Sequence, residues 1–185
     1  MSQFLSRRMI ISVFCVLGLL LCGARTHATD IPRTISATLT IFEDSELTGD
    51  VTCDVPLKTP GANPCISFGA DHIKLRLNGH TITGPVTPPT GCSLTTDSMF
   101  GVGIEAIDRI DVSIEGPGII QHFERWGILL GSTGHPSSQV TVKKVTAYHN
   151  CWSGMQVTNT SDSIIEENVL ADDAGGSNGA ACGGT

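Results

Sequence analysis

The sequence predicts an all-β fold, a parallel β-helix in which short strands stack as a solenoid, and three observations support it. A short pattern that opens with glycine occurs four times in the second half of the chain. Each of the first three copies is followed by two runs of alternating apolar and polar residues. These runs show no apolar period of 3.6 residues, so the repeating unit is β rather than α.

Each predicted coil contains three short strands. The first strands begin at the glycine, at 103–106, 127–130 and 154–157, and a fourth begins at 183–185, where the sequence stops. The second strands are predicted at 110–114, 140–142 and 164–166, and the third at 119–120, 145–146 and 169–170. The same triplet occurs upstream at 66–68, 73–77 and 81–82. We therefore expect about four coils, with the last one incomplete at the C-terminus.

Residues 1–28 have the features of a signal peptide. Arg7 and Arg8 precede an apolar run at 9–21, and small residues follow at 26–28, where a signal peptidase would cut. We expect a secreted protein, or a periplasmic or cell-envelope protein, with no membrane attachment after cleavage. A retained N-terminal anchor is the alternative.

The remaining chain is predicted to form one domain. Residues 29–46 are expected to be an N-terminal cap or lead-in strand, because the ends of a solenoid expose unpaired strand edges. Residues 47–185 are expected to be the β-helix repeats. The segment 85–99 is rich in proline and interrupts them as a loop insertion, either a groove wall or a plain surface loop.

Cysteine usage also indicates export. Cys53 and Cys65 flank a segment rich in proline and glycine, so they are a candidate disulfide. Cys151 and Cys182 fall on adjacent predicted coils and form a second candidate. Without the signal segment five cysteines remain, so at least one lacks a partner within this pairing scheme.

The charge balance excludes one class of partner. Removing residues 1–28 leaves a net charge of about −10, because three arginines are lost and all 18 acidic residues remain. An acidic chain without a basic stripe is a poor nucleic-acid binder. It also binds acidic polysaccharide poorly by charge alone, unless Ca²⁺ bridges the two.

One stretch resembles a known family. Residues 71–84, together with 47–53 and 65–68, are similar to the opening coil of right-handed parallel β-helix proteins of the pectate-lyase-like superfamily. The resemblance covers 47–185 and implies a right-handed coil and contact with polysaccharide. It is weak evidence for activity, because that superfamily contains lyases, hydrolases, epimerases and non-catalytic scaffolds.

Two polar clusters are candidates for chemistry. Superposing successive coils places His122 over His149 and near Asp172 or Asp173, a column that could bind a metal ion or move protons. The alternative is a solvated stack of turns. The second cluster contains Asp108, Arg109 and Asp111, with Glu105 and Glu115 nearby. It resembles the layout of β-helix lyases, in which acids hold Ca²⁺ and an arginine removes a proton; the alternative is an ordinary charged sheet face.

Aromatic residues provide candidates for substrate binding. Trp126 and Trp152 lie beside the strand-opening glycines, and with Tyr148 they could stack on sugar rings. Packing at the turns is the alternative.

We therefore expect a secreted β-helix protein that contacts or processes polysaccharide, without a complete catalytic set in this chain. Whether it is an enzyme stays open. The alternatives are a non-catalytic structural or cell-surface scaffold, and an N-terminal fragment of a polysaccharide lyase or hydrolase. An open edge at the last coil would favour a longer chain or a homo-oligomer.

Overall fold

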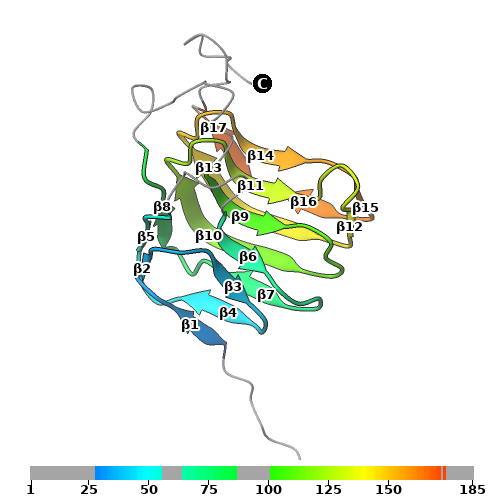
Figure 1. The fold of residues 1–185 in the computed structure, drawn as a ribbon, viewed down its shortest axis with the longest axis horizontal. Coiled ribbons are helices and arrows are strands. Elements are labelled where there is room, and N and C mark those ends of the chain that lie inside the picture. Colours follow the sequence, from blue (N-terminus) through cyan, green and yellow to red (C-terminus); the bar gives the residue numbers. More distant parts are fainter. Residues whose placement is uncertain (1–27, 56–63, 87–100, 172, 174–185) are drawn as a thin grey trace, which may run out of the picture.

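The computed structural model describes residues 28–55, 64–86, 101–171 and 173. These residues form parallel β-strands that stack in curled sheets as a solenoid (Figure 1). The strands are β1 (Thr29–Ile31), β2 (Thr34–Ile35), β3 (Leu39–Ile41), β4 (Ser45–Leu47), β5 (Val51–Cys53), β6 (Pro64–Phe68), β7 (Lys74–Arg76), β8 (Thr81–Thr83), β9 (Val102–Ala106), β10 (Ser113–Gln121), β11 (Trp126–Leu130), β12 (Ser137–Ser138), β13 (Thr141–Tyr148), β14 (Ser153–Val157), β15 (Thr160–Ser161), β16 (Ile164–Glu166) and β17 (Val169–Ala171).

Each strand pairs with its counterpart in the next coil. The five-stranded sheet has the order β14-β11-β9-β6-β3, and a ten-stranded sheet carries the other arms of the coils. Ile66, Ile104, Ile128 and Met155 occupy one register row of the five-stranded sheet, as the glycine-led repeats predicted. Among the described residues no helix is present that is long and apolar enough to cross a membrane.

The core is a column of inward-facing aliphatic side chains. Ile104, Ile114, Ile120 and Ile128 are fully buried, and they come from different arms of successive coils. Alternation along each strand sends the intervening residues outward. The apolar rows recognised in the sequence are therefore the rows that close the interior.

The structure differs from the predicted elements at the second and third strands. These runs are separate in the last described coil, as β16 and β17, but they merge into the single strands β10 and β13 in the two coils before it. The merged pair is in continuous register except for a shift between Glu115 and Gly118. At Gly116 an added Cβ would lie 1.8 Å from the Lys144 carbonyl oxygen, so only glycine fits where the two strands bend together.

The segment expected to be a cap or lead-in strand contains β1 to β3 and most of β4. β3 pairs with β6, and β1 pairs with β4, both in parallel. The five-stranded sheet therefore contains one more stacked strand than the four coils expected. The strands here have only two or three residues, which is too short to show a repeat in the sequence.

The predicted disulfide between Cys53 and Cys65 is confirmed, with the two Cα atoms 5.9 Å apart. Cys151 is also disulfide-bonded. Its predicted partner Cys182 lies outside the described residues, as do most of the signal segment, most of the 85–99 insertion and the fourth repeat at 183–185.

Candidate functional site

An open groove of about 760 Å³ lies along the outer side of the five-stranded sheet. It is bordered by the C-terminal end of β9, the start of β11, the loop that follows β11 and the end of β14. The residues that line it are Glu105, Ile107, Asp108, Arg125, Trp126, Leu129, Gly131, Ser132, Thr133, His135, Gln156 and Thr158. Polar, charged and aromatic side chains therefore meet in one concave surface.

Glu105 enters the groove because it alternates with the inward-facing Ile104 and Ala106 on β9. In the register of the sheet it lies between Ser67 and Leu129. The Ser67 hydroxyl donates a hydrogen bond of 3.3 Å to Glu105 Oε1. Burial raises the pKa of Glu105, and the Ser67 hydrogen bond and the charge of Arg109 oppose that rise. Glu105 is thus a carboxyl group that takes up a proton more readily than an exposed glutamate.

Asp108 lines the groove and contacts the loop that follows β11. Its carboxylate Oδ2 lies 2.8 Å from His135 Nδ1, and both side chains are exposed. His135 belongs to a tight turn in which Ser132 and His135 exchange backbone hydrogen bonds of 2.9 and 3.0 Å. Gly131 begins this loop with a φ of 61°, and an added Cβ would lie 2.1 Å from the Thr158 carbonyl oxygen. Close packing at Gly131 therefore holds the start of the 131–136 loop, and the contact of Asp108 with His135 holds the part near its end.

The third part of the groove is an arginine that stacks on tryptophan. The Arg125 guanidinium carbon lies 3.7 Å from the centroid of the Trp126 ring and 4.8 Å from that of Trp152. The two indole rings meet edge to face, with centroids 6.0 Å apart. Trp126 is almost buried, whereas Trp152 is 39% exposed. Burial lowers the pKa of Arg125, which still remains charged at neutral pH.

The predicted histidine column lies elsewhere, at the end of β10 and β13. The rings of His122 and His149 stack with centroids 6.0 Å apart, and Tyr148 stacks on His149 at 3.6 Å. The backbone N–H of His122 donates a hydrogen bond of 3.2 Å to the backbone carbonyl oxygen of His149, so the two residues occupy equivalent turns of successive coils. None of these three residues lines the groove.

Asp173 has a structural contact in this column. Its Oδ1 accepts a hydrogen bond of 2.8 Å from the Asn150 backbone N–H, one residue past His149. Asn150 repeats the arrangement one coil earlier, where its Oδ1 accepts from the Phe123 N–H at 3.1 Å. Burial raises the pKa of Asp173. Asp172, the other carboxylate predicted here, lies outside the described residues.

Burial, and to a lesser extent the proximity of His149, lowers the pKa of His122 from its ordinary value of 6.5. The folded state therefore binds this proton less well than the unfolded chain. The contribution of neutral His122 to the free energy of unfolding is therefore fully present above about pH 6.5, and it is lost as the pH falls through the lowered pKa.

We expect the melting temperature of the wild type to fall more between about pH 7.5 and about pH 5 than that of the His122→Asn variant. Asparagine suits the φ of 64° at this position. Because His122 is partly exposed, the difference in unfolding free energy is no more than about 0.5 kcal/mol. Glu105 and Asp173, whose raised pKa values act in the opposite sense, are present in both proteins. Parallel melting profiles would show that His122 does not contribute.

Of the predicted acidic cluster, Glu105 and Asp108 line the groove, whereas Asp111 and Arg109 do not. Asp111 Oδ2 lies 3.0 Å from His72 Nδ1, whereas Asp108 pairs with His135. Arg109 lies 3.9 Å from Asp71. Within the described part of the chain, no group of three or more His, Cys, Asp or Glu side chains is placed to hold a metal ion. Asp108 and Asp111, the two residues predicted as metal ligands, each contact a histidine on a neighbouring coil.

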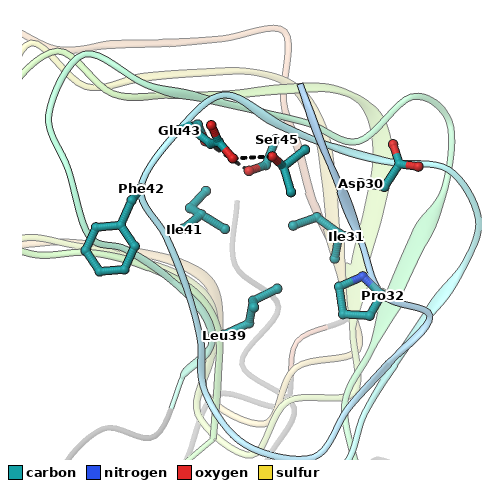
Figure 2. Close-up of a pocket in the computed structure, with 9 residues that line it drawn as sticks. Asp30, Ile31, Pro32, Leu39, Ile41, Phe42, Glu43 and Ser45 are labelled. Carbon is teal, nitrogen blue, oxygen red and sulfur yellow. Dashed lines mark hydrogen bonds between the residues drawn. The ribbon is translucent and has the colours of Figure 1, made fainter. Parts of the chain in front are cut away.

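A second hollow lies at the N-terminal end of the stack and is smaller, about 220 Å³. Figure 2 shows Ile31, Leu39 and Ile41 around it, inside the curve of the first coil. Ser45 donates a hydrogen bond of 2.9 Å to the Glu43 carbonyl oxygen at its edge. This hollow is the open end of the apolar core, with few polar groups that could orient a ligand.

Of the residues predicted to bind substrate, Trp126 lines the groove, Trp152 contacts Trp126 from outside it, and Tyr148 lies in the histidine column. Sequence reasoning missed Arg125, His135 and Gln156. Arg125 stands directly before Trp126, and that adjacency is the one signal that could have identified it.

Fold and groove together define this protein as an all-β solenoid with an aromatic and acidic groove on one outer face. Comparison with protein-family models, curated proteins and solved structures finds no match.

Proposed function

We propose that this protein is a secreted right-handed parallel β-helix of the pectate-lyase-like superfamily that binds polysaccharide in the groove. The observation that carries the proposal is the presence of an indole ring beside hydrogen-bonding side chains in one open groove of about 760 Å³. A sugar ring presents an apolar C–H face and a rim of hydroxyl groups. The C–H face packs on an aromatic ring, and the hydroxyl groups form hydrogen bonds with carboxylates, amides and guanidinium groups.

The groove has the residues for both kinds of contact. Trp126, which is 9% exposed, supplies the part of its indole ring that lines the groove, and Arg125 stacks on that ring at 3.7 Å. Glu105, Asp108 and Gln156 supply acceptors, and the Gln156 amide is held by a hydrogen bond of 2.8 Å to the Thr158 hydroxyl. An open groove, unlike a closed pocket, leaves room for a chain to continue beyond the bound units.

The disulfide between Cys53 and Cys65 and the bonded state of Cys151 support export, because such bonds persist mainly in oxidising compartments. The signal-like segment at 1–28 supports the same location. The similarity of residues 71–84 to an opening coil supports the right-handed family assignment.

A second candidate function is hydrolysis of the bound polysaccharide. The observation in its favour is Glu105, whose pKa is raised by burial within the groove. A carboxyl group of this kind can hold a proton and donate it to a glycosidic oxygen. Release of reducing ends, abolished by Glu105→Gln, would distinguish this function from binding alone.

Binding is tested by titrating polysaccharides into the protein and its variants. We expect Trp126→Ala to weaken binding about tenfold, equivalent to about 1.4 kcal/mol, because the stacking surface is lost. Gln156→Ala is a second groove variant, chosen because the side chain is only partly buried and its removal spares the core.

The matched control is Phe42→Ala, which removes an aromatic side chain that is 67% exposed at the N-terminal end of the stack. This variant is expected to bind like the wild type. Equal affinity in wild type, Trp126→Ala and Gln156→Ala, with all three folded, would refute the assignment of this groove.

A further inference from the structure

We infer that the groove selects uncharged polysaccharide over polyuronate and other polyanionic saccharides, an inference that rests on the proposed function. Two features favour a neutral ligand: carboxyl groups line the groove, and each nearby cation already has a contact of its own.

The lining carries two carboxyl groups, Glu105 and Asp108. A carboxylate on a bound sugar would lie in the same confined space as these groups. Like charges in a partly buried site repel, and the repulsion is screened less than it is at an exposed surface. A neutral sugar avoids this cost and offers hydroxyl groups to the same oxygens.

The cations near the groove already have anionic or aromatic contacts. His135 Nδ1 lies 2.8 Å from Asp108 Oδ2. Arg109 lies 3.9 Å from Asp71, and its charge opposes the rise in the pKa of Glu105. Arg125 stacks on the indole of Trp126. A polyuronate presents a carboxylate on each unit, and a binding groove for it needs cations repeated along its length.

The lysines of the described chain do not supply such a row. Lys74, Lys143 and Lys144 belong to the ten-stranded sheet, and their ammonium groups lie 3.5–3.6 Å from Glu115, Glu166 and Glu167 respectively. None of them lines the groove. Long-range attraction does not compensate either, because the whole chain carries a net charge of −7.

Glu105 adds a further preference. Burial already favours the protonated carboxyl, which can donate a hydrogen bond as well as accept one. A sugar hydroxyl can donate to the ionised carboxylate or accept from the protonated form, whereas a ligand carboxylate is repelled by the ionised form. The Ser67 hydroxyl, which donates to Glu105 Oε1, keeps this carboxyl group oriented toward the groove side of the sheet.

The test compares ligands on the full mature chain by calorimetric titration, with neutral galactan, xylan and β-glucan against polygalacturonate. We expect at least one neutral polymer to bind with an affinity that changes little with ionic strength. Polygalacturonate is expected to bind at least about tenfold more weakly, with or without added Ca²⁺. Tighter binding of polygalacturonate, weakened by salt or dependent on Ca²⁺, would overturn the inference and leave the proposed function standing. Absence of binding to every polymer would overturn the proposed function itself.

Charge variants provide the second measurement. In the Glu105→Gln, Asp108→Asn double variant the preference for neutral polymer over polygalacturonate should narrow about tenfold, because the repulsive groups are removed. The control is Glu166→Gln on β16, which removes one negative charge away from the groove and should leave the preference unchanged. An unchanged ratio in the double variant, or an equal shift in the control, would show that the lining carboxylates do not set selectivity.

Discussion

Replacing Asn150 by leucine is expected to lower the free energy of unfolding by about 2–6 kcal/mol, because two buried backbone groups lose their partners. Asn150 is fully buried. Its Oδ1 accepts from the Phe123 N–H at 3.1 Å, and its Nδ2 donates to the Ile120 carbonyl oxygen at 3.3 Å. Leucine has a similar volume but can make neither bond. Chemical denaturation followed by circular dichroism measures the loss.

The matched control is Asn168→Leu. Asn168, between β16 and β17, makes the same kind of pair of hydrogen bonds. Its Oδ1 accepts from the Val145 N–H and its Nδ2 donates to the Val142 carbonyl oxygen, both at 2.9 Å. It is only partly buried, so water can replace the lost bonds and the expected loss is about 1 kcal/mol. Equal losses in the two variants would mean that burial of the asparagine does not set its contribution.

Phe123→Ala is expected to cost about 3–5 kcal/mol, because it opens a cavity in the interior of the stack. Phe123 is 1% exposed, and its ring packs against two glycines. A Cβ added to Gly84 or Gly103 would lie 2.8 or 2.9 Å from that ring, so the neighbouring backbone is already in close contact with it. Such a tightly enclosed site cannot collapse easily around a smaller side chain.

Thermal and urea unfolding of this variant should be compared with those of Phe42→Ala, which makes the same change at an exposed position. The control is expected to differ from the wild type by less than about 0.5 kcal/mol. A small loss for Phe123→Ala, below about 1 kcal/mol, would contradict the close packing described above.

The arrangement of the coils was accessible from the sequence where inward rows repeat. Ile104, Ile128 and Met155 follow glycines at similar spacing, and they stack in register. The first coil was missed because β1 to β4 are at most three residues long, so period-2 alternation has too few positions to show. The fusion of two runs into β10 was missed because Gly116 and Pro117 look like a turn in a single sequence.

The groove could be predicted only in part. Asp108 and Trp126 were chosen for their chemistry, and both line it. His135 was missed because it lies in an irregular loop 27 residues after Asp108, and no repeat fixes that distance. The burial of Glu105 comes from neighbours on other coils, so strand alternation showed its outward direction but not its raised pKa.

The row of outward positions in the five-stranded sheet has an evolutionary consequence. Ser67, Glu105, Leu129 and Gln156 are consecutive in this row, one from each coil, and the residues beside the first three on their strands are buried in the core. Under the proposed function, a substitution at Glu105 or Gln156 can alter ligand preference with little effect on the core, whereas Leu129 is 4% exposed and packs with Val102 and Trp126. Under that proposal, selection can change recognition at the partly buried positions of this row while the framework of the coils is kept.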